Sequence, residues 1–354
     1  MVKNSNKSLM RVLGISFLFG MSSMSFAEIV MNSGSDQAKL SWSSEEANQL
    51  LNGDVSATAG DEGELSPQGS IKVSTSVRSS NGAAPAAPAK KVQIFDTSAS
   101  GYSNQPSVNA RAALVMDGQT GEVLYSKNSN TAFPIASLTK LMTAVVISDS
   151  RLNMSEKITL QQGDFSCSGC KSSSSTLRAG DSMNRAEALL FALMKSENPA
   201  ASALARTYPG GRPAFFAAMN AKARSLGMNS THYVESTGLH PGNVASARDL
   251  GILVNTASQY GLIRQFSTTP SYDFNLGYRV LKSNNTNALV RNGGWNINLS
   301  KTGYINEAGR CVVMHTTLNN RPAVVVLLGA DSSAARTNDA TRLMTWVSQL
   351  PKRI

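Results

Sequence analysis

The stretch ASLTKLMTAVV, residues 136–146, places Ser137 three residues before Lys140 at the start of an apolar run. On a helix, residues i and i+3 share one face, so the Lys140 amine can reach the Ser137 hydroxyl. A serine hydroxyl is a poor nucleophile until a base takes its proton, and burial lowers the pKa of a lysine enough to make it that base. The stretch therefore indicates either a nucleophilic site or an ordinary helix start, with Ser137 as N-cap and Lys140 in solvent.

The spacing alone does not choose between these two interpretations. A second Ser-x-x-Lys pair, Ser168 and Lys171, lies in SCSGCKSSSS, residues 166–175. That segment is polar and predicts a loop with no helix behind it, so it cannot bury a lysine. Motifs elsewhere in the sequence are needed to choose between the two interpretations of Ser137.

The segments around residues 136–146 predict an α+β domain. In residues 110–128, apolar and polar side chains alternate on both sides of DGQTG, which predicts a β-hairpin. Helical spacing of apolar residues recurs in segments 138–150, 184–196, 200–208, 212–228 and 247–260. Segments 294–305, 310–318 and 321–330 predict three strands in a meander, and 332–350 a closing helix. Strands at both ends imply one antiparallel sheet with a helical cluster, and a site in the cleft between them.

The N-terminus predicts export. Lys3, Lys7 and Arg11 precede an apolar run, residues 12–21, and small residues follow at Ser25 and Ala27. This is the pattern of a signal peptide, residues 1–27, and its apolar run is short for a membrane span. An uncleaved anchor is the alternative. We expect a periplasmic protein with no integral membrane anchor after cleavage.

The mature chain divides into two parts. Residues 28–106 are rich in Ser, Gly, Ala, Pro and Asn and predict a flexible low-complexity linker, whereas residues 107–354 can bury the core of one domain. The net charge is +10, and removing the three basic groups of residues 1–27 leaves +7. Such a charge suits an anionic polymer or a merely basic surface. No basic-aromatic motif accompanies it, so we expect no nucleic-acid partner.

Cysteine and histidine are sparse, and we expect neither a metal site nor a cofactor. Cys167 and Cys170 have redox or half-zinc spacing, but no second pair supplies two more ligands. In an oxidising compartment the pair indicates a local disulfide or two free thiols on a loop. Cys311 lies in an apolar strand-like run and indicates a buried small hydrophobe.

Two further motifs complete a catalytic pattern. KSENPAA places Ser196 and Asn198 just past an apolar helix, and LSKTGYI places the chain's one Lys-Thr-Gly run, residues 301–303, on a predicted strand. Ser-x-Asn alone is a weak signal, because it occurs five more times. The value lies in the three motifs, their order and the elements that carry them.

This set resembles the penicillin-binding serine DD-peptidases, whose fold is shared with serine β-lactamases and transpeptidases. Over residues 107–354 the sequence is similar to those of the D-alanyl-D-alanine endopeptidase branch of the low-molecular-weight penicillin-binding proteins. The segments that carry the similarity are PIASLTKLMTA, ALMKSEN, RTYPGGRPAFFAAMNAKARSLGM, STGL, ARDL, SKTGYINEAGRCVVM and RLMTW.

The resemblance implies a role for each motif residue. Ser137 would attack the carbonyl of a D-alanyl peptide bond and form an acyl-enzyme, with Lys140 as the base. Ser196 would relay a proton to the leaving amine, and Asn198 would hold Lys140 and the substrate amide.

Further residues would bind the substrate. Lys301 would supply a positive charge that keeps Lys140 neutral, and Thr302 would bind the substrate carboxylate. Gly303 would let the substrate backbone lie against the strand. The amides of Ser137 and Tyr304 would form the oxyanion hole, and Arg336 would be a second carboxylate partner.

The implied function is a DD-endopeptidase that cuts the D-alanyl–diaminopimelate cross-links of peptidoglycan stems and is inhibited covalently by β-lactams. A D-alanyl-D-alanine carboxypeptidase is the alternative. Such enzymes usually add a β-rich domain and an amphipathic helix, which we do not expect after WVSQLPKRI. A non-catalytic penicillin-binding sensor would normally lack a catalytic member. A β-lactamase would need a carboxylate to activate water, and the Glu235 context does not match one.

Three features depart from the resemblance. Glu197 stands where Asp is common, and we expect its side chain to point away from the site. Pro199 and the SCSGC insertion are also unusual for this branch. We expect them to affect substrate access more than chemistry.

Overall fold

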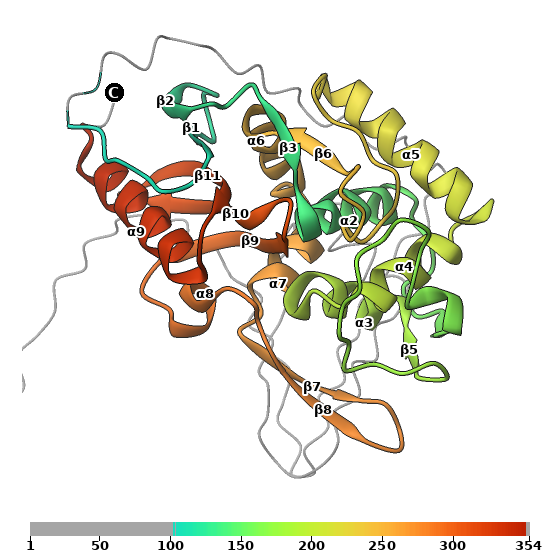
Figure 1. The fold of residues 1–354 in the computed structure, drawn as a ribbon. Helices are drawn as coiled ribbons and strands as arrows, with labels where there is room; N and C mark the ends of the chain where they lie inside the picture. The colour runs from blue at the N-terminus through green and yellow to red at the C-terminus, as the bar shows by residue number, and fades with distance from the viewer. Residues whose placement is uncertain (1–101, 103, 352–354) are drawn as a thin grey trace, which may run out of the picture. The chain divides into compact units, whose positions relative to one another are not determined.

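The central element of the fold is a five-stranded antiparallel sheet that joins the two ends of the folded chain (Figure 1). The computed structural model describes residues 102 and 104–351; the predicted signal peptide and nearly all of the predicted linker lie outside the described residues. The strand order is β2-β1-β11-β10-β9. The strands are β1 (Ala112–Asp117), β2 (Val123–Lys127), β9 (Asn296–Ile305), β10 (Gly309–Leu318) and β11 (Arg321–Ala330).

The predicted hairpin and meander are confirmed, and β1 pairs with β11 to close the sheet. Leu114 lies opposite Val326, and Val115 lies opposite Val325. Successive side chains of a strand point to opposite faces. Leu114 therefore packs into the larger core under the helical cluster, whereas Val115 packs under the closing helix α9 (Ser333–Gln349). Both faces of the sheet are covered.

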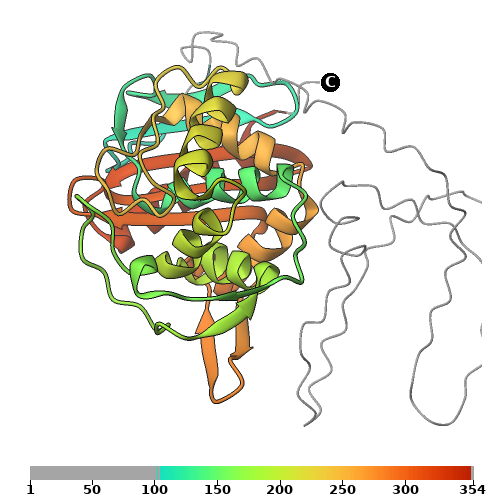
Figure 2. The same ribbon diagram turned by 90° about the vertical axis from the view of Figure 1, so that its right-hand side faces the viewer.

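The helix that follows Ser137 is a core helix. In α2 (Thr139–Asp149), ten of eleven residues are buried, so it is apolar nearly all round. It contacts α4 (Asn198–Arg206), α5 (Gly211–Leu226) and α6 (Ala247–Ala257). In Figure 2 the helical cluster stands in front of the sheet, whose strands run behind it. The predicted helices are confirmed in type and within a few residues at their ends.

The predicted helix over 184–196 is interrupted. It forms α3 (Arg185–Leu190) and continues as a π-helical turn, Phe191–Lys195. Ser196 then takes a left-handed conformation, with φ +64°, which ends the turn. Irregular turns of this kind occur often at functional sites, and this one ends directly at Ser196.

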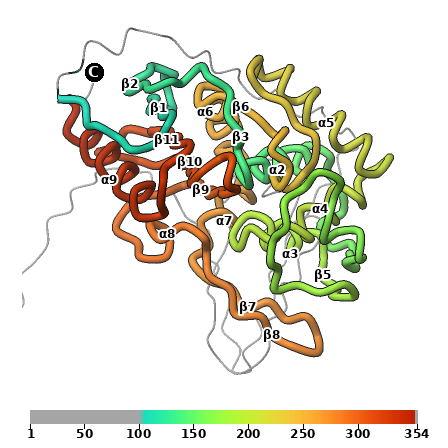
Figure 3. The backbone as a smooth tube through the Cα atoms, viewed as in Figure 1, coloured from blue at the N-terminus to red at the C-terminus, as the bar shows by residue number. Residues whose placement is uncertain are grey.

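Several elements were not predicted from the sequence. Helix α7 (Gly261–Thr268) packs on β9, and β7 (Ser271–Asn275) with β8 (Val280–Asn284) forms a hairpin that extends away from the sheet and the helical cluster (Figure 3). A short α8 (Ala288–Asn292) precedes β9. Two small ladders pair β3 (Ala132–Pro134) with β6 (Val244–Ser246) and β4 (Lys157–Thr159) with β5 (Ser182–Asn184). None of the helices between residues 102 and 351 combines the length and hydropathy needed to cross a bilayer.

Tyr102, in the segment predicted as linker, contacts the C-terminal helix. Its ring meets Trp346 edge-on, with 6.1 Å between ring centroids, and its hydroxyl donates to Glu122 at 3.0 Å. Tyr102, which precedes residue 107, thus packs against the domain that begins there.

A buried charge network ties the helical cluster to the loop before it. The Asp164 carboxylate is fully buried and pairs with Arg206 of α4 at 2.9 Å and with Arg212 of α5 at 2.6 Å. Removing one partner of a buried ion pair leaves the others uncompensated.

We therefore expect Asp164→Asn to lower the free energy of unfolding by about 3 kcal/mol, because two arginines lose their counter-charge. Urea denaturation of the full chain measures this. Asp273→Asn, the same change at an exposed residue of β7, should stay within about 0.5 kcal/mol. Equal denaturation midpoints for the two variants would contradict the expectation.

Candidate active site

Ser137 lies in a short 3-10 turn, Ala136–Leu138, that leads directly into α2. Ala136 has φ +48°, a left-handed conformation that is uncommon for residues other than glycine. The Thr139 hydroxyl donates to the Ala136 carbonyl oxygen at 2.8 Å, and the Asn243 amide donates to that hydroxyl at 3.0 Å. These hydrogen bonds hold a strained turn in place, as is common at functional sites.

Lys140 is fully buried, with 0% of its surface exposed. Its Nζ lies 2.9 Å from Ser137 Oγ, 2.6 Å from Asn198 Oδ1 and 2.7 Å from the carbonyl oxygen of Thr237. The structure thus brings together the first two sequence motifs, and the alternative of a solvent-exposed Lys140 does not occur.

The geometry determines the direction of the hydrogen bond between Ser137 and a neutral Lys140. The oxygens of Asn198 and Thr237 can only accept hydrogen bonds, so a neutral amine uses its two hydrogens on them. Its lone pair then remains for the Ser137 hydroxyl, which donates. A neutral Lys140 in this position is therefore aimed at the Ser137 proton.

Burial lowers the pKa of Lys140 to about 7, while the nearby carboxylates of Glu235 and Glu197 act in the opposite direction. Near neutral pH a large fraction of the amine is therefore unprotonated and able to accept a proton.

Lys301 and Ser196 form a second pair on the other side of the site. Lys301 is 1% exposed, and its Nζ donates to Ser196 Oγ at 2.9 Å and to the Thr302 carbonyl oxygen at 2.8 Å. Burial lowers the pKa of Lys301 well below its ordinary value, and the charges of Lys140 and Arg336 lower it further. The positive charge expected on Lys301 is thus disfavoured by its surroundings, and an anion bound beside it would restore that charge.

Two glycines let the backbone close around Ser137. A Cβ added to Gly303 of β9 would lie 3.0 Å from the amide nitrogen of Ser137, closer than most Cβ atoms approach a neighbour. Gly238, with φ +84°, lies against the Ala136 carbonyl group from another direction, and a Cβ there would overlap it. The strand and the 237–239 loop therefore clamp the turn that carries the nucleophile.

A buried carboxylate that the sequence analysis set aside supports this loop. Glu235 is 5% exposed and accepts hydrogen bonds from the amides of Thr237 and Gly238 and from the Asn243 side chain, the last at 2.9 Å. Asn243 in turn reaches Thr139, so one network holds both the Thr237 carbonyl and the Ala136 turn. The sequence signal was an acid two residues before a tight Thr-Gly turn, which is common in ordinary loops.

Glu197 points away from the Ser137 hydroxyl, as predicted. Its carboxylate accepts from the hydroxyls of Ser175 and Thr176, each at 2.6 Å. Its charge still acts on Lys140 and raises the pKa of that amine. Pro199 occupies the first turn of α4, where proline is tolerated.

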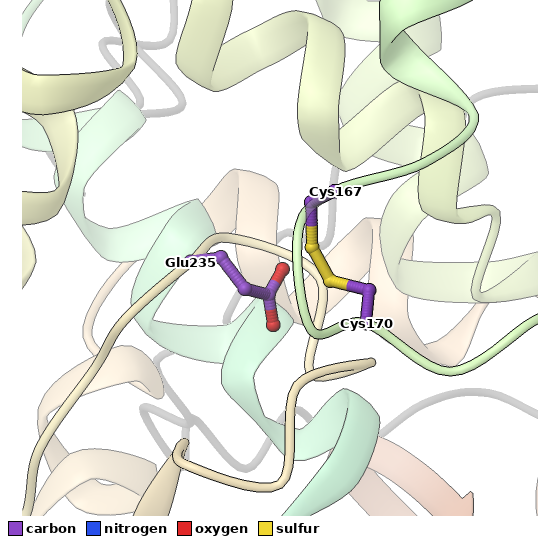
Figure 4. A group of neighbouring side chains, drawn as sticks. All are labelled: Cys167, Cys170 and Glu235. Carbon is purple, nitrogen blue, oxygen red and sulfur yellow. A yellow bond between two sulfur atoms is a disulfide. The ribbon is translucent and has the colours of Figure 1, made fainter.

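Cys167 and Cys170 are joined in a disulfide that lies against the Glu235 loop (Figure 4). The two sulfurs and a Glu235 oxygen lie within 4.8 Å of one another. Thiolates bind metals, whereas these sulfurs are bonded to each other and the carboxylate accepts from amides. The same loop reaches the sheet, because Lys171 pairs with Glu307 at 2.6 Å. The arrangement is a strap beside the site rather than a set of metal ligands.

Three of the predicted substrate-binding residues, Thr302, Gly303 and Tyr304, lie on β9. This strand is the last in the sheet, so no further strand pairs with its outer edge, where an extended peptide could add. Thr302 is nearly buried, with its hydroxyl 2.7 Å from that of Thr286, and Tyr304 is 45% exposed. Arg336 of α9 is 8% exposed, and its charge is felt at Lys301.

Comparisons with known proteins agree with this geometry. The sequence pattern of the Peptidase S11 family, described as D-alanyl-D-alanine carboxypeptidase, matches residues 99–332. The chain is 46% identical to the D-alanyl-D-alanine endopeptidase of Pseudomonas aeruginosa, over 69% of this chain and 78% of that protein. It is 44% identical to the endopeptidase of Escherichia coli, over 72% and 82%. The structure is similar to that of the Streptomyces K15 DD-transpeptidase, with a TM-score of 0.64 and 29% identity, covering 70% of this chain and 100% of that one.

The close approach at Gly303 generates one prediction. Gly303→Ala should slow acylation by a fluorescent penicillin about 100-fold, because the new Cβ pushes the strand away from the Ser137 amide. Gly163→Ala adds a Cβ where nothing lies within 4 Å, and it should keep the wild-type rate. Labelling time courses measure both rates, and an unchanged rate in Gly303→Ala would disprove the role of the close approach.

The pKa of Lys140 generates a second prediction. If Lys140 acts as the base, its neutral form is the active one, and kcat/KM should fall about tenfold per pH unit below about pH 7. Glu235→Gln removes a charge that raises the pKa of Lys140. The acid limb of the profile, where kcat/KM falls with decreasing pH, should therefore move to lower pH. Glu197→Gln should move this limb less. The distant Asp273→Asn change should leave the limb in place. A Glu235→Gln limb that coincides with the wild type would contradict the electrostatic assignment.

Proposed function

The chain belongs to the Peptidase S11 family of D-alanyl-D-alanine carboxypeptidases, and on that premise we propose that it is a serine DD-endopeptidase acting on peptidoglycan peptides. The observation that carries the proposal is the Lys140 amine, fully buried and 2.9 Å from the Ser137 hydroxyl. Its other two partners are carbonyl oxygens. That arrangement serves to remove one proton from one serine.

In the first step Ser137 Oγ attacks the carbonyl carbon of a D-alanyl peptide bond while Lys140 takes the hydroxyl proton. The amides of Ser137 and Tyr304 stabilise the developing oxyanion. The clamp of Gly303 on the Ser137 turn supports this assignment, because it holds the strand bearing Tyr304 against the nucleophile.

In the second step the C–N bond breaks and the leaving amine takes a proton. Ser196 lies between Lys301 and the site and can relay that proton to the amine. Asn198 keeps Lys140 in position through its carbonyl oxygen, and its amide nitrogen is bonded to Ser173 at 2.8 Å. Water then attacks the acyl carbon and the bond from that carbon to Ser137 Oγ breaks. Ser137 takes back the proton that Lys140 holds, and the proton that water loses replaces the one given to the amine.

The carboxylate next to the leaving nitrogen binds at Thr302 and Arg336. A buried guanidinium and a hydroxyl at the strand edge suit a carboxylate. Its negative charge would also favour the protonated form of Lys301, whose pKa burial and neighbouring cations hold down. Binding of the correct substrate would thereby prepare the proton donor.

Sequence identity to the named relatives favours cleavage of a cross-link over removal of a terminal D-alanine. The relatives named endopeptidases are 46% and 44% identical, whereas those named carboxypeptidases in Bacillus subtilis and Escherichia coli are 31% and 28% identical. We therefore propose the D-alanyl–diaminopimelate cross-link as the substrate bond, with carboxypeptidase activity as the second candidate.

Penicillins are proposed as covalent inhibitors. Rapid hydrolysis of a penicilloyl-enzyme needs a base placed to activate water, such as a free carboxylate. Glu235 and Glu197, the acids whose charges act on Lys140, are already bonded to amides and hydroxyls. Deacylation should therefore be slow.

The setting of this chemistry is proposed to be the periplasm. The support is the predicted signal peptide, residues 1–27, followed by a linker, residues 28–106, and the catalytic domain from residue 107 to 354. Cell-wall substrates lie in that compartment, and a bonded Cys167–Cys170 pair suits it.

Two defined muropeptides test the proposal. Residues 28–354 should convert a cross-linked dimer into two monomers, read by mass spectrometry, and preincubation with penicillin should block the reaction. Ser137→Ala should lower the rate by a factor on the order of 10⁴ or more, because no other nucleophile is in place. A second variant, Ser168→Ala in the other Ser-x-x-Lys pair, should keep wild-type activity.

Loss of one alanine from a pentapeptide monomer, with the dimer left intact, would identify a carboxypeptidase instead. Full activity in Ser137→Ala would overturn the catalytic assignment as a whole.

A further inference from the structure

Three arginines, on β10, α9 and α8, lie close enough for their charges to interact, and the one on β10 is next to β9. Arg310 lies directly across from Tyr304 in the β9–β10 ladder. Arg336 lies near the start of α9, and Arg291 lies in α8. Their charges act on one another, because Arg310 and Arg291 both lower the pKa of Arg336, after the larger effect of burial. This cluster, Arg291, Arg310 and Arg336, is called the arginine cluster below.

The arginine cluster has no counter-charge within residues 104–351. No ion pair or side-chain hydrogen bond joins Arg310 or Arg336 to a described residue, and Arg291 donates only to the backbone oxygen of Asn285, at 2.7 Å. Arg336 is 8% exposed. Two like charges beside a largely buried guanidinium disfavour its charge, and a bound anion would offset that repulsion.

Arg310 is fixed in position by an aromatic platform. Its Cζ lies 3.6 Å from the centroid of the Tyr304 ring, a cation–π contact. Tyr304 is itself oriented, because its hydroxyl donates to Asn306 Oδ1 at 2.7 Å. The stacked guanidinium therefore stands next to the strand edge with its N–H groups available, one residue pair beyond Gly303.

The two candidate leaving groups differ in the charges they carry. Terminal D-alanine has one carboxylate, on the carbon next to the scissile nitrogen. Diaminopimelate of a cross-linked stem has that same carboxylate, and the rest of its stem carries further carboxylates. One guanidinium with Thr302 satisfies the first carboxylate, which leaves Arg310 and Arg291 for a second.

We propose that Arg310, stacked on Tyr304 and aided by Arg291, forms a second carboxylate subsite that selects cross-linked stems over terminal D-alanine as the leaving group. The inference rests on the proposed function, because it concerns the substrate of the same site. Arg310 is a specificity-determining residue in this view and takes no part in bond cleavage.

The experiment combines a change in the enzyme with a change in the substrate. It measures kcat/KM for the cross-linked dimer and for the pentapeptide monomer with wild type and Arg310→Ala. A third substrate is the dimer with the carboxylates of its leaving stem converted to amides, except the one next to the scissile nitrogen. Arg310→Ala should lower kcat/KM for the dimer about tenfold and for the pentapeptide less than about twofold.

Amidation should lower the wild-type rate on the dimer by the same factor. Because both changes remove one contact, the amidated dimer should lose no more than about twofold further in Arg310→Ala. Arg224→Ala, which removes an equal charge from the exposed end of α5, should behave as wild type. An unchanged rate of penicillin acylation in Arg310→Ala shows that its catalytic centre is intact.

The proposal would be overturned if Arg310→Ala lowered kcat/KM equally for the dimer and the pentapeptide. It would also be overturned if the losses caused by Arg310→Ala and by amidation multiplied when the variant cleaves the amidated dimer. The substrate comparison with wild type alone does not depend on any variant folding: an amidated dimer cleaved at the full rate also overturns it. A wild type that cleaves the pentapeptide and leaves the dimer intact is a different result, because it refutes the proposed function itself.

Discussion

The active site depends on one buried amine with a fixed set of acceptors. Lys140 has no exposed surface, and the oxygens of Asn198 and Thr237 occupy two of its three hydrogen-bonding positions. An amine removed from water needs such partners, and their placement leaves the third position to Ser137. The first residue of α4 and the loop after Glu235 are therefore tied to the helix that bears the nucleophile. A shift of any of these three segments leaves a buried polar group without a partner.

Close backbone approach supplies the second constraint. Gly303 and Gly238 let a strand and a loop press on the turn before α2, where Ala136 adopts a positive φ. The strain in that turn persists because hydrogen bonds through Thr139 and Asn243 hold it. These contacts hold the strand that bears Tyr304 against the Ser137 amide, which supports the proposal that the amides of both residues stabilise an oxyanion.

The acidic and basic side chains of the site form two separate groups, with carboxylates near Lys140 and cations near Lys301. The carboxylates of Glu235 and Glu197 lie behind Lys140, where amides and hydroxyls bind them and their charges raise its pKa. The cations lie on the substrate side, from Lys301 through Arg336 to Arg310, and burial together with mutual repulsion disfavours the charges of Lys301 and Arg336. An anion bound beside them would offset that repulsion and favour the protonated form of Lys301.

The sequence by itself determined the α+β sheet joined from both chain ends, most of the helices, and the positions of the three motifs, because strand and helix periodicities are local properties of the chain. It did not reveal the π-helical turn before Ser196, the hairpin of β7 and β8, or the roles of Glu235 and Arg310, whose local context is that of ordinary loops and strand ends. Only the tertiary structure decided that Lys140 is buried and aimed at Ser137. Its acceptors lie 58 and 97 residues further along the chain, and the desolvation that changes its pKa exists only once those distant segments pack together.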